Sequence, residues 1–137
     1  AQLLYGYIDM HLKNKMDLQV DVAIDEINES FWHSIFDFPL NCLRDIDANF
    51  NLVIPYGSKM YIDTLQTLMN YADSFLDQIR KHVSDQGNMS EQYNKYNGYQ
   101  EGAKDLTWSY GTFWNTAKLR NNVKLGLQEI EKLNQKP

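Results

Sequence analysis

The stretch from Ser58 to Ser84 carries a continuous apolar stripe with the period of an α-helix, and it constrains the fold more than any other feature. The stripe consists of Leu65, Leu68, Met69, Ala72, Phe75, Leu76, Ile79 and Val83. Residues spaced three or four apart share one face of a helix, and Ser58 is a preferred N-cap residue. We therefore predict one long helix over 58–84 that is buried along one face. Burial of each large side chain contributes about 1.5–3 kcal/mol.

Other periodic segments lie on both sides of this helix. They predict a helix over 1–13, a second helix from Asp21 to the Phe38-Pro39 break, a fourth over 104–121 and a separate tail helix. The inner face of the fourth helix is predicted to be Leu106, Tyr110, Phe113, Trp114 and Ala117. Residues 14–20 are predicted to form a short extended link, and residues 40–57 a long loop, because neither keeps a helical period. The predicted class is all-α.

Composition and charge exclude several classes of protein. A chain of 137 residues suffices for one domain. The net charge of -5 and the pI near 5.1 argue against nucleic acid as a partner, because phosphate binding needs clustered Lys and Arg. No apolar run is long enough to span a bilayer, so we predict no membrane insertion.

Metal and cofactor motifs are absent from the sequence. Cys42 is the single cysteine, and the histidines at positions 11, 33 and 82 have no second ligand at metal-binding spacing. Asp45 and Asp47, with Asn49 and Asn51, lack the glycine and terminal Glu of a calcium loop. We therefore predict no metal and no cofactor.

Two N-glycosylation sequons are present, at Asn28-Glu29-Ser30 and at Asn88-Met89-Ser90. Asn28 and Asn88 are accordingly glycosylation candidates. They favour a secretory route for the protein.

The polar, aromatic-rich stretch from Met89 to Tyr110 holds the candidate chemistry. Ser90 and Gln92 flank Glu91 and could orient its carboxylate, and Tyr93, Tyr96 and Tyr99 could build a wall on which a sugar stacks. Trp108 and Tyr110 follow near the start of a helix, where backbone N–H groups favour negative charge. An ionised carboxylate among polar donors suits general base catalysis on water. The alternative reading of Glu91 is a solvated loop carboxylate.

The same stretch resembles the C-terminal part of fungal and yeast glucoamylases, glycoside hydrolase family 15. The resemblance is carried by Met89-Ser90-Glu91-Gln92-Tyr93 and by Ala103-Lys104-Asp105-Leu106-Thr107-Trp108-Ser109-Tyr110. Upstream, Ala1-Gln2-Leu3-Leu4-Tyr5 and Tyr71-Ala72-Asp73-Ser74-Phe75 also resemble family segments. Gly102 and Lys104 depart from the family, which commonly has serine and arginine there. Losing the serine removes a hydroxyl donor near Glu91.

The resemblance implies the last helices of an (α/α)6 barrel, with residues 1–137 as a single segment of the catalytic domain and no starch-binding domain. It implies that Glu91 is the general base, that Trp108 lies near the pocket, and that Ser90, Gln92 and Tyr93 support substrate binding. The implied reaction is inverting hydrolysis of α-1,4 and, more slowly, α-1,6 links from the non-reducing ends of starch, glycogen, dextrin or maltooligosaccharides. The general acid would lie in the upstream part of the same domain, so the isolated chain is expected to be inactive.

Two questions stay open at this point. Family members are mostly secreted, with a vacuolar or other intracellular yeast form as the alternative. The alternative function is a non-enzymatic all-α sugar-binding or interaction module with a degenerate version of the loop.

Overall fold

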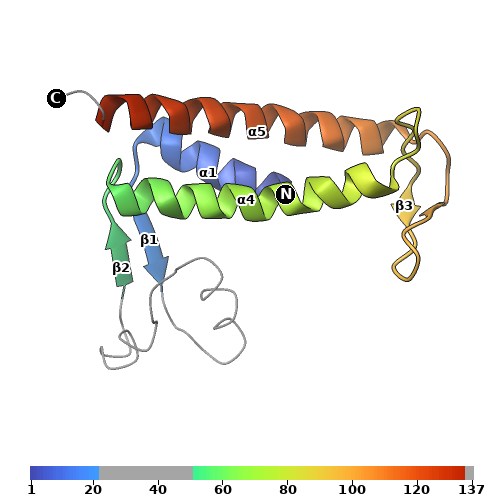
Figure 1. The fold of residues 1–137 in the computed structure, drawn as a ribbon, viewed down its shortest axis with the longest axis horizontal. Coiled ribbons are helices and arrows are strands. Elements are labelled where there is room, and N and C mark those ends of the chain that lie inside the picture. The colour runs from blue at the N-terminus through green and yellow to red at the C-terminus, as the bar shows by residue number, and fades with distance from the viewer. Residues whose placement is uncertain (22–50, 135–137) are drawn as a thin grey trace.

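The computed structural model describes residues 1–21 and 51–134, which form three long helices, one antiparallel pair of strands far apart in the sequence and one short hairpin (Figure 1). In chain order the elements are α1 (Gln2–Asn14), β1 (Leu18–Asp21), β2 (Asn51–Ile54), α4 (Lys59–His82), β3 (Gln92–Tyr93), β4 (Gln100–Glu101) and α5 (Thr107–Asn134). The predicted all-α class is confirmed. The helix predicted after Asp21 lies outside the described residues.

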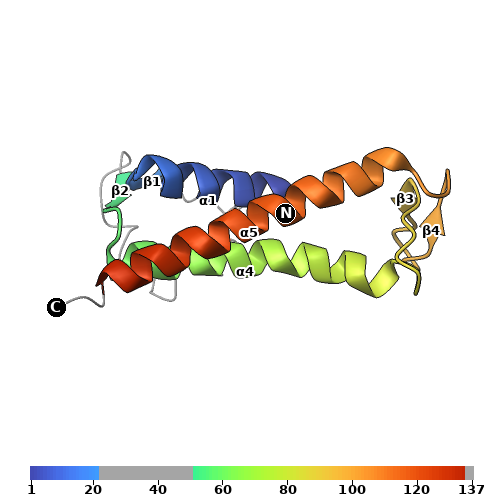
Figure 2. The same ribbon diagram turned by 90° about the horizontal axis from the view of Figure 1, so that it is seen from above.

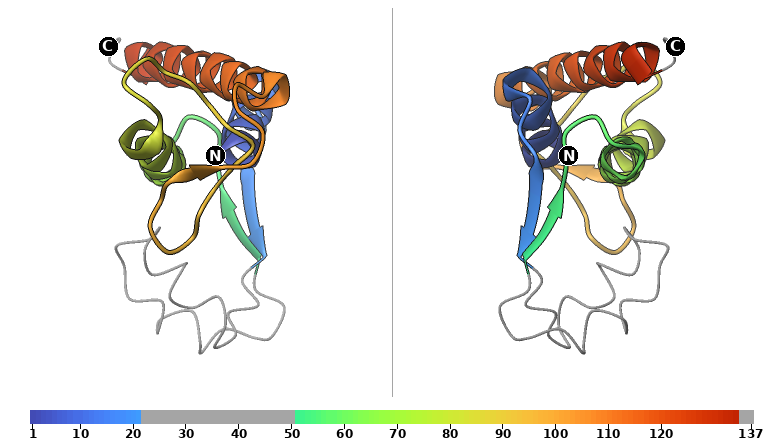
Figure 3. Two further views of the ribbon diagram at one scale, coloured as in Figure 1. Left: turned by 90° about the vertical axis from the view of Figure 1, so that its right-hand side faces the viewer. Right: turned by 90° about the vertical axis from the view of Figure 1, so that its left-hand side faces the viewer.

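The three helices lie side by side, with α5 crossing over α1 and α4 (Figure 2). The antiparallel strand pair β1–β2 lies where α1 ends and α4 begins, and it extends to one side of the helices (Figure 3). The antiparallel β3–β4 hairpin lies at the opposite end, beside the end of α4 and the start of α5. The segment that contains Glu91 is therefore placed at one end of the bundle.

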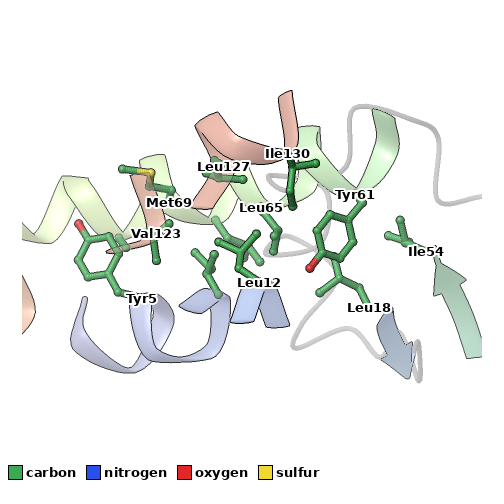
Figure 4. Close-up of a cluster of buried hydrophobic side chains, with 13 residues drawn as sticks. Tyr5, Leu12, Leu18, Ile54, Tyr61, Leu65, Met69, Val123, Leu127 and Ile130 are labelled. Atoms are coloured by element: carbon green, nitrogen blue, oxygen red, sulfur yellow. The ribbon is translucent and has the colours of Figure 1, made fainter. Parts of the chain in front are cut away.

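The hydrophobic core lies where the three helices meet, toward the β1–β2 end (Figure 4). It contains Tyr5, Ile8, Leu12, Leu18, Ile54, Tyr61, Leu65, Leu68, Met69, Ala72, Val123, Leu127 and Ile130. Within each helix these residues recur at three- and four-residue spacing, as one buried face requires. The predicted stripe of α4 is buried in its first half, whereas Phe75 in its second half is 45% exposed. Ser58 caps α4 as predicted, since its Oγ accepts the Tyr61 N–H at 3.1 Å.

Next to this core, the Asp73 carboxylate bonds side chains from both other helices. Asp73 on α4 accepts hydrogen bonds from Arg120 Nε at 2.8 Å and Arg120 Nη2 at 2.6 Å, both from α5. It also accepts the hydroxyl of Tyr5 on α1. Burial alone would raise the pKa of the Asp73 carboxyl, but the hydrogen bonds from Arg120 and Tyr5 outweigh burial and lower it.

The prediction of two C-terminal helices is wrong, because α5 is continuous from Thr107 to Asn134. The sequence between the two predicted helices holds asparagines of modest helix propensity but no proline, and burial of Val123 and Leu127 keeps the helix intact. The helix also begins later than position 104. Gly102 and Asp105 have positive φ values of 80° and 52°, which no helix accommodates.

Two further expectations are corrected. Residues 51–54, predicted as loop, form a strand in which Ile54 pairs with Leu18, so that both side chains are buried at the 1% level. The predicted inner face of the helix at 104–121 is largely open in the described structure, since Trp114 is 72% and Phe113 38% exposed. The buried positions of α5 instead begin at Thr116.

Candidate active site

A cavity of about 660 Å³ lies at the β3–β4 end of the bundle, between the start of α1, the second half of α4 and the first half of α5. Its wall consists of Ala1, Gln2, Leu3, Phe75, Leu76, Ile79, Met89, Ser90, Glu91, Tyr93, Trp108, Ser109, Thr112, Phe113 and Thr116. Four predicted site residues, Ser90, Glu91, Tyr93 and Trp108, are thus brought to one cavity. Within the described part of the chain, Glu91 is the single acidic residue of this wall.

Glu91 is held against the main chain that follows the β3–β4 hairpin. Its N–H donates to the carbonyl of Ala103 at 2.9 Å, and its Oε2 accepts the Ala103 N–H at 3.2 Å. Gly102 provides the space for this arrangement. A Cβ at position 102 would lie 2.5 Å from Glu91 Oε2, and its φ of 80° disfavours any side chain. Gly102 is therefore more than a lost serine donor, because it makes room for the carboxylate.

The start of α5 holds the segment before Glu91 through Tyr110 and Ser109. The Tyr110 hydroxyl accepts the Met89 N–H at 3.0 Å and donates to Asp105 Oδ1 at 2.7 Å. The Met89 N–H would lower the pKa of Tyr110, but the Asp105 carboxylate and burial together raise it. Ser109 Oγ donates to the Ser90 carbonyl at 3.0 Å. Neither role was predicted from the sequence, although both residues lie within the motif that carried the resemblance.

The aromatic residues divide between the cavity and the hairpin tip. Trp108 lines the cavity and is 67% exposed, and Tyr93 lines it half-buried, with a pKa raised by burial. Tyr96 and Tyr99 are 86% and 75% exposed at the hairpin and are not part of the cavity wall. Of the predicted tyrosine wall, Tyr93 alone borders the cavity.

Two further predicted site residues that the structure describes, Gln92 and Asn88, do not line the cavity. Gln92 is exposed and pairs with Glu101 across the hairpin, so it is not among the lining residues. Asn88 is exposed. The positions predicted as candidates between 22 and 50, namely Asn28, His33, Cys42, Asp45, Asp47 and Asn49, lie outside the described residues.

Histidines and acidic residues of the described ranges form no metal site. His11 is buried against Tyr7, with ring centroids 4.4 Å apart, and His82 is exposed beside Tyr93. Residues 1–21 and 51–134 contain no group of three His, Cys, Asp or Glu side chains arranged to hold a metal ion. Nor does this part of the chain contain a helix with the length and apolar character needed to cross a bilayer.

The chemistry available here is that of a carboxylate at the edge of an apolar and aromatic cavity. Aromatic faces suit the apolar faces of a sugar ring, and hydroxyl groups such as that of Thr112 suit its polar edge. The carboxylate can take a proton from water. A single carboxylate provides one half of the acid–base pair that glycoside hydrolysis requires.

Comparison with known proteins finds that most of the chain is similar to glycoside hydrolases. The family model described as glycosyl hydrolases family 15 matches residues 15–118. The intracellular sporulation-specific glucoamylase of Saccharomyces cerevisiae is 36% identical over 120 residues, which are 88% of this chain and 21% of that protein. Glucoamylase GLU1 of Saccharomycopsis fibuligera is 34% identical over 104 residues, which are 76% of this chain and 20% of that protein.

A solved structure of a glucoamylase from Saccharomycopsis fibuligera superimposes with a TM-score of 0.74 at 31% identity. The superposition covers 90% of this chain and 24% of that one. The chain thus spans about a fifth of the length of the relatives it matches. The matched region contains α4, Glu91 with its hairpin, and the start of α5 with Trp108, and on this ground the chain belongs to the glycosyl hydrolases of family 15.

Proposed function

We propose that this chain is the C-terminal part of a glucoamylase catalytic domain and that Glu91 is the general base of its active site. One observation carries the proposal, namely that Glu91, the single acidic residue of the cavity wall among the described residues, lines the same cavity as Trp108 and Tyr93. The family membership supports the same class of enzyme.

In the proposed reaction Glu91 takes a proton from a water molecule, whose oxygen attacks the anomeric carbon of a terminal glucose. A general acid on the opposite side of the sugar protonates the departing glycosidic oxygen. An inverting pair of this kind is separated by about 6.5–9.5 Å, which leaves room for the water. The acid would come from a part of the protein outside this chain, so the isolated chain would be inactive.

The proposed substrates are starch, glycogen, dextrins and maltooligosaccharides, cleaved at α-1,4 links and more slowly at α-1,6 links. Trp108 and Tyr93 would stack against the sugar at the cavity, and Ser90 would support it through its position next to the base. Gln92 is not part of the cavity wall, so it would support substrate binding from outside the cavity. The product would be β-D-glucose, because a single displacement inverts the anomeric carbon.

The proposal is tested by Glu91→Gln in the complete protein, with Glu101→Gln as the matched control. Glu101 is an exposed glutamate of the same hairpin that bonds Asn94 Nδ2 at 2.7 Å and lies outside the cavity wall. Losing the base should lower glucose release from maltose by about 10²–10⁴-fold, whereas the control should retain it. The thermal midpoint of both variants should equal that of the parent. Near-normal turnover by Glu91→Gln would refute the assignment.

For the cellular route we propose secretion, with Asn28 and Asn88 glycosylated. The support is the pair of sequons and the exposure of Asn88. The relative described as intracellular favours the alternative of a vacuolar or other internal compartment. Fractionation of a culture distinguishes the two, because a secreted protein is recovered from the medium and an internal one from the cells. Treatment of the native protein with an N-glycosidase tests the glycosylation itself, since removal of a glycan changes the gel mobility.

A further inference from the structure

The main chain from Asn88 to Glu91 belongs to no helix and no strand, yet its four N–H groups and the first three of its carbonyls are hydrogen-bonded. The N–H groups of Asn88, Met89, Ser90 and Glu91 donate respectively to Ser84 Oγ, Tyr110 Oη, Gln100 Oε1 and the Ala103 carbonyl. The carbonyls of Asn88, Met89 and Ser90 accept from Gln100 Nε2, the Leu106 N–H and Ser109 Oγ. Five of these seven bonds come from side chains, which hold the segment where a regular element would use its own main chain.

Gln100 makes more of these bonds than any other side chain in the described structure. Its Oε1 accepts the Ser90 N–H at 2.6 Å, and its Nε2 donates to the Asn88 carbonyl at 3.0 Å. The same Nε2 donates to the carbonyl of His82, the last residue of α4, at 3.3 Å. One half-buried amide thus joins the end of α4, the segment before Glu91 and strand β4.

Only an amide satisfies all three main-chain groups. Gln100 meets one N–H and two carbonyls, so it must offer an acceptor and donors together. A carboxylate could accept from Ser90 but would face two carbonyl oxygens without a proton to donate. A methionine would fill similar volume and make none of the bonds.

From these contacts we infer that Gln100 is a positioning residue that sets the place of the Glu91 carboxylate in the reaction. The inference rests on the proposed role of Glu91 as general base. The Glu91 side chain is exposed and, among the described residues, accepts one bond at 3.2 Å, so its location is set mainly by the main chain that carries it. Freeing the Ser90 N–H and the Asn88 carbonyl lets that main chain move and carries the carboxylate away from the attacking water.

The experiment compares Gln100→Met with Asn97→Ala in the complete protein, using maltose as substrate. Asn97 lies on the same hairpin and also bonds main chain, accepting the Tyr99 N–H at 2.9 Å, but its bond stays within the hairpin tip. Gln100→Met should lower kcat by about tenfold to a hundredfold, the loss expected from a displacement of roughly 1 Å, with KM changed less than about twofold. Hydrogen exchange at the Ser90 amide should become faster. Asn97→Ala should leave both quantities at the parent values.

The outcomes separate this inference from the proposal on which it rests. If Glu91→Gln is inactive while Gln100→Met keeps the parent kcat, the role of Gln100 is overturned and that of Glu91 stands. If Glu91→Gln keeps its activity, both fail. If Gln100→Met does not fold, Gln100→Glu replaces it, since it keeps the acceptor for Ser90. Its kcat should then fall below that of the parent with KM retained, and an unchanged kcat overturns the inference.

Discussion

Removing Asp73 should destabilise the protein through a buried hydroxyl more than through a lost ion pair. In Asp73→Ala the hydroxyl of Tyr5, a residue with 0% exposure, loses its acceptor, and an unsatisfied buried hydroxyl costs about 1–3 kcal/mol. The Arg120 side chain is 40% exposed, so water replaces much of what it loses, and this part is limited to about 0.2–1 kcal/mol. The expected loss of unfolding free energy is therefore about 1–4 kcal/mol.

Urea unfolding of the complete protein, followed by tryptophan fluorescence and far-ultraviolet circular dichroism, measures this loss. The matched control is Asp77→Ala, one turn further along α4. Asp77 contacts Arg80 at 3.3 Å, with both side chains more than half exposed, so the control should lose less than about 1 kcal/mol.

A second substitution isolates the hydroxyl. Adding Tyr5→Phe to Asp73→Ala removes the group that was left unsatisfied, so the double variant should recover part of the lost stability. If Tyr5→Phe instead lowers stability further by the amount it costs in the parent protein, the two residues are not coupled and the reasoning is refuted.

Three other perturbations have defined outcomes. Because the pKa of Asp73 is lowered on folding, its contribution to stability is present above the ordinary value of 3.8 and is lost as the pH falls through the folded value; the stability difference between the parent and Asp73→Asn should shrink below pH 3.8 in acid unfolding curves. Gly102→Ala should displace Glu91 and lower kcat at least about tenfold, whereas Gly87→Ala, with the same positive φ and no atom within 4 Å of the added Cβ, should lower stability alone by about 1–2 kcal/mol. Ser58→Ala removes the cap of α4 and should cost about 1 kcal/mol by urea unfolding, and no loss would show that the cap bond is dispensable.

Helix periodicity predicted the elements that bury an apolar face. The helix over 58–84 was placed almost to the residue, because its stripe and its cap at Ser58 are local signals. The break predicted after Asn121 was wrong, because propensity is a weak prior that the burial of Val123 overrides. The partner strand of Leu18 was missed, since pairing across a long stretch of chain leaves no local signal at Ile54.

The candidate site was predictable where one motif holds it and unpredictable where contacts are tertiary. Glu91 and Trp108 come from a motif, and the structure brings both to one cavity. The bond from Ala103 to Glu91 and the three bonds of Gln100 depend on how the hairpin folds back on α4. The sequence offers no spacing rule for such contacts.

Because α5 is one continuous helix, it connects the hydrophobic core rigidly to the candidate site. Val123 is fully buried in the core, and Trp108 lies about 22 Å away along the helix axis, at 1.5 Å per residue. A rotation of the helix by about 3° around Val123 would shift Trp108 by about 1 Å over that length. The helices α5 and α1 are closely packed near Val123, because a Cβ on Gly126 would lie 3.0 Å from Leu12 Cδ1 on α1. Substitutions at this distant helix crossing would therefore alter the alignment of Trp108 without touching any residue of the cavity.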